Sequence, residues 1–443
     1  MSLTLQEFEE QVLELARHRA EQAEVFSVET VETPVTFEAN RLKQLKTRRT
    51  RGVALRVIAG GRIGLASTTL LENPADLVRD ALAVAEFGAQ AGFELPHTIE
   101  ASTPAVFDPA VESLSVDEMV ETGQRMIDRA RAENSALLCE AHLDKVVSTV
   151  RIRNSRGAAG SYRGTSFSLS FGVNLIRGTD MLDIWEGQSS RRLDISADEM
   201  VETVLHKVRL ADRTAKVPTA QLPVILSPKG AAGTLVESLA AGFNGKIVLQ
   251  GASPVGDKLG KKVFSDKLTL YDDGLLDYGA GSAPFDDEGV PTRRTALVTE
   301  GVVTAFIYDL FTAYLAGTQS TGNAERSLSS LPSPALHTVW MAPGDAALED
   351  MLADVKEGLL VDQVMGAWAG NILAGEFSGN VHLGYRIENG QIVGRVKDTM
   401  IAGNVFQALS SIAAVGKELY WVGGSLRLPY IYLPALGVAS KEA

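Results

Sequence analysis

The run Asp286–Glu288 brings three carboxylates together and is the most distinctive group of reactive side chains in the sequence. Gly289 follows directly, and Arg293 and Arg294 stand a few residues further on. Neighbouring carboxylates can share a proton or bind a cation, so the run could carry acid–base or metal chemistry. The same residue types suit a solvated loop, in which the acids cap a turn and pair with the arginines. From these residues alone we favour the loop.

The histidine and cysteine positions give little support for a metal site. The six histidines are His18, His97, His142, His206, His337 and His382. No two of them fall within the reach of one metal-binding motif. Cys139 is the single cysteine and stands three residues before His142, a separation that places the two side chains on opposite faces of a strand. Each histidine is therefore predicted to be an ordinary surface or core residue.

Motifs for nucleotide binding and for serine nucleophiles are incomplete. Gly251–Lys258 has the two glycines of a P-loop but places Asp257 where that motif needs a lysine. Gly279 and Gly281 lack the third glycine of a dinucleotide fingerprint, and no G-x-S-x-G sequence occurs. These classes of site are therefore not predicted.

The composition narrows the class of protein further. The 443 residues carry a formal net charge of −13, which argues against direct contact with nucleic acid. No apolar run approaches the roughly 18 residues that a membrane span requires. The acidic segment Met1–Glu10 does not resemble a secretory signal, and a single cysteine excludes an intrachain disulfide. We expect a cytoplasmic protein.

One basic stretch stands out against this acidic background. Residues Arg41 to Arg56 include seven basic side chains and no acid. Such a stretch could bind an anionic partner or RNA. It could also be an edge strand whose lysines and arginines prevent unwanted pairing with other sheets. We favour the edge strand.

The segment Leu222–Gly245 is the element best suited to position reactive side chains. A short apolar run predicts a buried strand, a Ser-Pro-Lys-Gly turn follows, and a segment rich in Ala and Leu predicts a helix over about 230–243. A helix entered directly from a buried strand is rigid, and a metallopeptidase would place His and Glu on it. Here Glu237 is the one acid of the helix, and no histidine lies between Lys207 and Ala305.

The N-terminal half is predicted to alternate capped helices with strands. Thr4 with Glu7, and Ser115 with Glu118, form capping boxes, and Ser196 begins another helix. The predicted helices cover about 5–23, 75–91, 116–132 and 197–212. The predicted strands cover 24–32, 34–50, 52–58, 63–68, 137–152 and 165–176.

The chain changes character after the linker predicted at 215–221. Many glycines, short apolar runs and turns such as Glu388–Gly390 indicate a mostly β region, with a hairpin around Thr299–Gly301 and a helix near 345–358. Runs of strands without regular β–α alternation argue against a doubly wound sheet. We predict an α+β fold, with a mixed helix and antiparallel-sheet domain over 1–214 and a mainly β domain over 222–443.

Several C-terminal motifs together resemble the TldD/PmbA family, whose members were once described as modulators of DNA gyrase. The resemblance rests on the sequences APFDDEGVPTRRTALVTEGVV at 283–303, STGNA at 320–324, GLLV at 358–361, IENG at 387–390 and IAGN at 401–404. It continues more weakly through the N-terminal half, including the hairpin over 52–68. It therefore covers essentially the whole chain.

The resemblance implies a two-subunit protease system that acts on unfolded peptides. In it a TldD-type subunit carries an HExxxH zinc motif and a downstream cysteine ligand, and a TldE/PmbA-type subunit lacks them. On that motif, Val236 stands at the first histidine, Glu237 at the glutamate and Ala241 at the second histidine. The chain is thus similar to the TldE/PmbA branch, with no metal or other cofactor of its own and zinc in a TldD-type partner.

If the chain is such a peptide-holding subunit, the position of its polar residues predicts which of them face a substrate or partner. Polar residues within glycine-rich motifs usually lie on loops. The candidates for binding substrate or partner are Asp286, Asp287, Glu288, Thr321, Asn323 and Ser378. Glu237 matches the motif glutamate but is expected to be structural, so no catalytic residue is assigned.

Three hypotheses of function follow. The first is a subunit that holds unfolded peptides for a TldD-type partner. The second is an independent peptidase or other hydrolase with an unrecognised site. The third is a homodimeric peptide- or protein-binding regulator without protease activity, because homologous chains that pair also offer a surface for a symmetric dimer.

Overall fold

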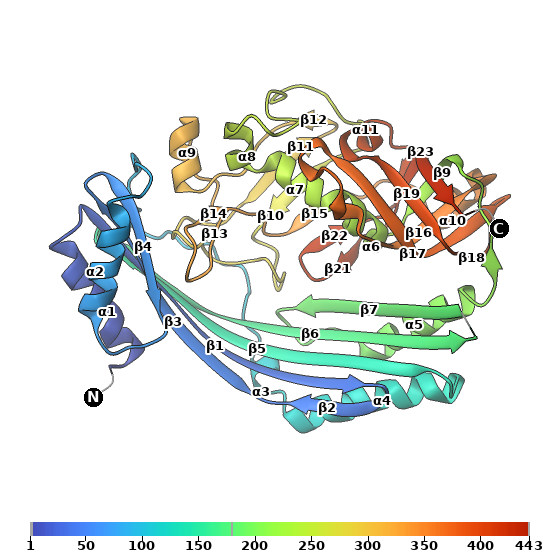
Figure 1. Cartoon of the computed structure of the whole chain (residues 1–443), viewed down its shortest axis with the longest axis horizontal. Helices are drawn as coiled ribbons and strands as arrows, with labels where there is room; N and C mark the ends of the chain where they lie inside the picture. Colours follow the sequence, from blue (N-terminus) through green and yellow to red (C-terminus); the bar gives the residue numbers. More distant parts are fainter. Residues whose placement is uncertain (1–2, 179, 442–443) are drawn as a thin grey trace.

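The computed structural model describes residues 3–178 and 180–441 and confirms the α+β fold. A long, curved antiparallel sheet forms the N-terminal part, and the β-rich C-terminal part lies on its concave side (Figure 1). Within the described residues, no helix is both long and apolar enough to cross a lipid bilayer.

The N-terminal sheet is built from long strands in the order β4-β3-β1-β5-β6-β7, with β2 paired to the end of β1. The strands are β1 (Gln22–Glu38), β2 (Arg41–Leu45), β3 (Arg48–Ala59), β4 (Arg62–Thr68), β5 (Leu138–Asn154), β6 (Ala159–Arg177) and β7 (Asp180–Ser190). All pairings within it are antiparallel, and the hairpin predicted over 52–68 is confirmed as β3–β4.

The strand boundaries predicted at Pro34 and Thr50 are wrong. β1 runs without a break through Pro34, and the chain reverses at Ala39 and Asn40, whose φ angles are 46° and 67°. Asparagine tolerates this left-handed conformation, and the Asn40 carboxamide accepts a hydrogen bond from the Cys139 amide at 2.8 Å. A proline was therefore compatible with a long strand, and a two-residue turn without glycine marked its end.

Helices cover the two ends of this sheet (Figure 1). They are α1 (Leu5–Arg17), α2 (Pro74–Ala85), α3 (Pro109–Ser113), α4 (Val116–Glu133) and α5 (Ala197–Leu210). The capping boxes at Thr4 and Ser115 are confirmed. However, α1 and α2 end about six residues earlier than predicted from their apolar spacing.

The C-terminal part contains a larger and a smaller sheet and a short ribbon. The larger sheet contains β8 (Thr214–Ala215), β9 (Ala220–Leu226), β16 (Glu357–Met365), β17 (Glu376–Glu388), β18 (Gln391–Val396), β19 (Thr399–Asn404), β20 (Ala414–Val415) and β23 (Ile431–Ser440). The smaller sheet contains β10 (Leu270–Asp273), β11 (Arg294–Thr299), β12 (Val302–Val303), β15 (Val339–Met341), β21 (Tyr420–Val422) and β22 (Leu426–Leu428). β13 (Ala324–Glu325) and β14 (Ser333–Pro334) form the ribbon.

Short helices connect these strands. They are α6 (Pro228–Ala231), a π-helical turn (Ala232–Val236), α7 (Glu237–Phe243), α8 (Gly245–Leu249), α9 (Leu310–Ala316), α10 (Leu348–Asp354), α11 (Val405–Ser410) and the 3-10 turns Ala367–Ala369 and Ile372–Ala374. The hairpin predicted around Thr299–Gly301 is confirmed as β11–β12.

The two parts share a hydrophobic core, so neither is a separate body. Leu169 and Phe171 of β6 and Val204 of α5 belong to the same buried cluster as Leu383 and Ile387 of β17. A second cluster packs the face of α6–α7 between the two C-terminal sheets. This shared core fixes the concave face of the N-terminal sheet against the C-terminal loops.

Candidate functional site

The strand-to-helix element predicted at 222–245 is present and rigidly mounted. Ser227 caps the helix by accepting a hydrogen bond from the Gly230 amide at 3.1 Å, and Pro228 occupies the first turn. The middle turn, Ala232–Val236, is π-helical, a rare geometry that is frequent at functional sites. The side chain of Leu239 is buried, whereas Glu237 is exposed to solvent.

A cavity of about 390 Å³ lies beside the first turns of this helix. Lys229 lies 4.0 Å from the centre of the Trp185 ring and donates a hydrogen bond to the Trp185 carbonyl at 2.7 Å. Burial lowers the pKa of Lys229, although Glu186, 3.3 Å away, opposes this shift. These contacts tie β7 to α6 and leave the indole of Trp185 half exposed at the cavity.

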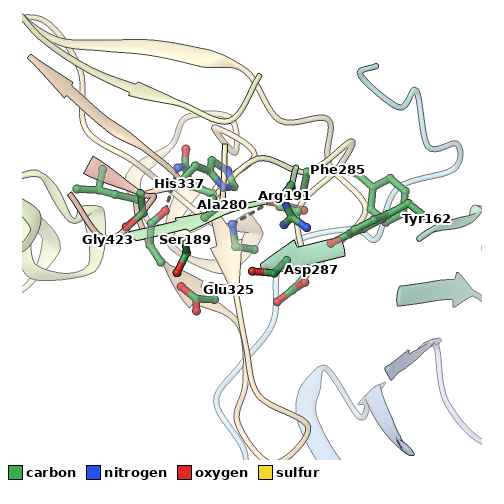
Figure 2. A pocket seen from close by; sticks show the side chains of 18 residues that line it. Tyr162, Ser189, Arg191, Ala280, Phe285, Asp287, Glu325, His337 and Gly423 are labelled. Carbon is green, nitrogen blue, oxygen red and sulfur yellow. Dashed lines mark hydrogen bonds between the residues drawn. The ribbon is translucent and has the colours of Figure 1, made fainter. Parts of the chain in front are cut away.

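A larger cavity, of about 500 Å³, opens at the junction of the N-terminal sheet with the C-terminal loops. Its volume is in the range of small-molecule and peptide sites. Figure 2 shows Arg191, Tyr162 and Asp287 gathered at one end, with His337 and Gly423 toward the other. The wall is completed by Ser166, Ser189, Ala280, Gly281, Ala283, Phe285, Asp286, Asn323, Ala324, Glu325, Ala335, Leu336 and Ser425.

Asp286 and Asp287 of the acidic run lie in this wall, and the prediction that the run forms a solvated loop is wrong. Asp286 is only 3% exposed and Glu288 only 1%. The predicted capping role is present, because Asp286 accepts hydrogen bonds from the amides of Glu288, Val290 and Ala324 at 2.9 to 3.0 Å. Burial and the adjacent Glu288 raise the pKa of Asp286, and these amides oppose the shift.

The arginines that pair with the run are not its sequence neighbours. Arg293 donates to the carbonyls of Ser320 and Thr321. Arg294 lies 4.0 Å from the ring centres of both Tyr271 and Trp340. Glu288 instead pairs with Arg56 of β3, at 2.5 Å. The acidic run therefore does pair with an arginine, as predicted, but the partner is Arg56 and not Arg293 or Arg294.

Arg56 sits at the centre of a fully buried charge network. It contacts Glu24 of β1 at 3.0 Å as well as Glu288, and Glu24 also contacts Arg326 at 3.0 Å. Burial lowers the pKa of Arg56, but the two glutamates more than offset this and raise it. The network joins the N-terminal sheet to two C-terminal loops.

This network also revises the prediction for residues 41–56. β2 is an exposed edge strand, as predicted. β3 is not an edge strand, because it lies between β1 and β4, and its exposed Arg48 and Arg49 pair with Glu32 and Glu29 across the strands. Three of the seven basic residues, Arg48, Arg49 and Arg56, are thus paired with glutamates of β1.

Asn323 is held in the wall by a second set of buried bonds. Its amide nitrogen donates to an Asp272 carboxylate oxygen at 2.6 Å and to the Ala335 carbonyl at 2.9 Å. The other Asp272 oxygen accepts from the His337 amide at 2.7 Å. Burial raises the pKa of Asp272. These bonds fix the loops that carry Asn323 and His337 against β10.

Arg191, Tyr162 and Asp287 differ from these groups because each keeps bonding capacity toward the cavity. Arg191 donates through Nε to the Gly279 carbonyl at 3.1 Å, and its two terminal nitrogens form neither hydrogen bond nor ion pair with any described residue. Asp287 accepts one bond, from the Arg326 amide at 2.9 Å. Burial raises the pKa of Asp287 to about 6 and that of Tyr162 to about 12.

Comparison with known proteins places this architecture in a family. Three profiles match consecutive segments of the chain: PmbA/TldA metallopeptidase domain 1 at 23–85, the central domain at 109–216 and the C-terminal domain at 219–440. The chain belongs to the PmbA/TldD metallopeptidase family.

Individual relatives agree with this assignment. Metalloprotease PmbA of Escherichia coli O157:H7 is 27% identical over 99% of this chain and 96% of its own length. The metalloprotease TldD homolog of Haemophilus influenzae is 27% identical over 83% of this chain and 80% of its own. TldE from Thermococcus kodakarensis has the same fold, with a TM-score of 0.88 at 23% identity, covering 98% of this chain and 100% of that one.

The PmbA/TldD assignment calls for a test of whether zinc fits the helix. Val236 and Ala241, which the resemblance places at the histidine positions, carry no atom that can bind zinc. Val236 instead packs against the C-terminal core. Among residues 3–178 and 180–441, no group of three or more His, Cys, Asp or Glu side chains forms a possible metal site. These positions do not fit a zinc ion, and no step through zinc is derived for this chain.

The residues predicted to face substrate or partner divide into four groups. Asp286, Asp287 and Asn323 line the large cavity, whereas Glu288 is buried in the charge network. Thr321 is half-buried and donates its hydroxyl hydrogen bond to the Tyr308 carbonyl. Ser378 is exposed on β17, apart from the residues that line this cavity.

Sequence reasoning missed the residues that the N-terminal sheet contributes to the cavity. Tyr162 lies on β6 and Arg191 directly follows β7. Neither stands in a recognisable motif. The available signal was weak: a pair of arginines, Arg191 and Arg192, directly after the polar residues Gln188, Ser189 and Ser190.

Proposed function

We propose that this protein is the TldE/PmbA-type subunit of a cytoplasmic peptidase, and that it holds unfolded peptides while a TldD-type partner cleaves them. The main support for this proposal is the set of side chains on the helix Pro228–Phe243. The element is retained as a rigid mount, yet Val236 and Ala241 offer no zinc ligand. Without a metal-bound water, Glu237 has nothing to deprotonate, so cleavage is assigned to the partner.

Two features support a role in holding peptides. The large cavity is polar and lies where two parts of the molecule meet, a common place for a binding site. β7 is the last strand of the N-terminal sheet and faces the C-terminal part (Figure 1). An extended peptide can add to such an edge through main-chain hydrogen bonds, and the exposed Trp185 and Met181 would contact its side chains.

The proposal is tested by reconstitution. The protein is mixed with a purified TldD-type subunit and an unfolded peptide, and cleavage is followed by mass spectrometry. The expected result is inactivity of this chain alone, even with added zinc, manganese or cobalt, and a gain over the partner alone in the mixture. A mixture no more active than the partner would refute the subunit role. Cleavage by this chain alone would instead establish an independent hydrolase.

The alternative is a homodimeric peptide- or protein-binding regulator. Exposed apolar side chains Leu249, Leu315 and Leu331 lie around a separate cavity of about 370 Å³. Such a surface can bury against a homologous chain or a second copy. Light scattering measures the mass of the assembly with and without the TldD-type subunit, and this distinguishes the homodimeric regulator from the peptidase subunit. A homodimer that persists in the mixture favours the regulator.

A further inference from the structure

Arg191 is a partly buried cation whose strongest hydrogen-bonding groups are unused. Nε is bonded to the Gly279 carbonyl, whereas the two terminal nitrogens have no hydrogen-bond partner in the described chain and remain accessible at the cavity. The adjacent Arg192, in contrast, is exposed and binds Asp194 at 2.7 Å. A guanidinium with two free parallel donors is shaped to bind a carboxylate in a bidentate manner.

The sheet makes room for this guanidinium. A Cβ atom placed on Gly164 of β6 would lie 2.7 Å from an Arg191 terminal nitrogen. The side chain therefore lies directly over a position that lacks a side chain. Burial lowers the pKa of Arg191, with Tyr162 opposing the shift. The cation is thus partly desolvated, which strengthens its attraction for an anion that reaches it.

The groups facing Arg191 indicate what kind of anion fits. Asp287 lines the same cavity with a carboxylate oxygen that accepts no bond, yet Asp287 and Arg191 do not pair with each other in the described structure. Glu325 adds an exposed carboxylate to the wall. These acids would repel a phosphate or a second carboxylate. They would attract a ligand that carries N–H donors next to a single carboxylate.

Tyr162 lies beside these opposite charges. Figure 2 shows its hydroxyl end directed toward Arg191 and Asp287. Its ring is held by an edge-to-face contact with Phe285, with the ring centres 5.3 Å apart, and its hydroxyl has no partner among the described residues. The phenol can therefore donate to the same carboxylate as Arg191.

We propose that this cavity binds the free carboxyl-terminal residue of a peptide. Arg191 and Tyr162 bind the terminal carboxylate, and Asp287 accepts a hydrogen bond from a peptide N–H. An interior peptide segment offers no charge to Arg191, and its backbone carbonyl is a weaker acceptor than a carboxylate. The inference deepens the proposed function by naming which part of an unfolded peptide this subunit holds.

The test is calorimetric titration of the full chain, without any partner, with tri-alanine and with tri-alanine amide. The two peptides differ only in the terminal charge. The free acid is expected to bind roughly tenfold or more tightly than the amide, because a charge-assisted pair is lost. Equal affinities, or no binding of the free acid, would overturn the proposal. Inorganic phosphate that binds as tightly as tri-alanine would also overturn it, as a general anion site.

Three variants locate the binding. Arg191→Met is expected to abolish the preference for the free acid, whereas Arg192→Met is the matched control and should keep it. Gly164→Ala should also weaken tri-alanine binding, since it displaces the guanidinium but retains its charge. Each variant is compared with the native protein by thermal unfolding. If Arg191→Met does not fold, Gly164→Ala decides: unchanged tri-alanine affinity in that variant refutes the site.

Two further titrations separate the sources of a carboxylate. Free alanine carries the same carboxylate without a peptide N–H, and acetyl-glutamate α-amide carries a carboxylate on its side chain only. Both are expected to bind roughly tenfold more weakly than tri-alanine. Equal binding of either compound would overturn the assignment to a peptide end. Because the TldD-type subunit is absent, failure of the reconstitution assay leaves these results intact, and failure here leaves subunit pairing intact.

Discussion

The two sides of the loop at 285–290 differ in whether their buried charges have ionic partners within the protein. On one side Glu288 contacts Arg56, which also contacts Glu24, and all three side chains are buried. On the other side Asp287 faces the cavity with an unbonded oxygen, and Arg191 lines the same space without pairing to it. Adjacent residues of one acidic run therefore serve a closed network and an open site.

The contrast gives a physical criterion for separating architecture from binding. A buried ion whose partners are all internal is needed to keep neighbouring segments together, because removing one partner leaves another charge stranded. A desolvated ion that opens to a cavity does not need its charge for the fold and remains able to bind a ligand. The number of acids in the run does not distinguish these roles. Their partners do.

The largest expected effect is on the closed network. Arg56→Met leaves Glu288 buried without its ionic partner and leaves Glu24 with Arg326 alone, so the free energy of unfolding should fall by about 3–5 kcal/mol. Denaturant unfolding followed by circular dichroism measures the change. The control is Arg49→Met, which removes an exposed pair with Glu29 and should change stability little. Equal losses in the two variants would mean that burial of the network does not matter.

The next effect is a pH dependence at the open site. Burial raises the pKa of Asp287 from 3.8 to about 6, so between these values the folded protein binds a proton more tightly than the unfolded chain. The contribution of Asp287 to the free energy of unfolding is therefore largest below this window and falls as pH rises through it. The fall should amount to roughly 3 kcal/mol.

Asp287→Asn isolates this contribution because the variant cannot ionise at this position. Native protein and variant are unfolded in denaturant at a series of pH values between 4 and 7. The variant should gain stability relative to the native protein as pH rises. A constant difference between the two curves would show that Asp287 titrates at the same pH in the folded and unfolded states.

The sequence predicted local structure well and long-range partners poorly. Caps at Thr4 and Ser115, the hairpin over 52–68 and the helix after Leu226 all follow from patterns within a few residues, and each is present. Arg56 and Glu288 stand 232 positions apart, and no local pattern indicates that they meet. Their contact depends on how the C-terminal loops settle on the N-terminal sheet.

In the candidate site, too, residues within local motifs were predicted and residues brought in by long-range contacts were not. Asp286, Asp287 and Asn323 were identified because they stand in motifs of the PmbA/TldD family, and all three line the cavity. Arg191 and Tyr162 were missed because their significance arises only when β6 and β7 face those motifs. A charge without a partner can be recognised only once the whole set of possible partners has been placed.

The smallest expected effect gives the sharpest comparison between the two sides of the loop. Tyr162→Phe removes a hydroxyl that has no partner among the described residues, while the ring contact with Phe285 is retained. The free energy of unfolding should therefore change by less than about 0.5 kcal/mol, in contrast to Arg56→Met. Affinity for tri-alanine should nevertheless fall several-fold, because the terminal carboxylate loses one donor. A large loss of stability would mean that Tyr162 belongs to the architecture, and the division between closed network and open cavity would have to be drawn elsewhere.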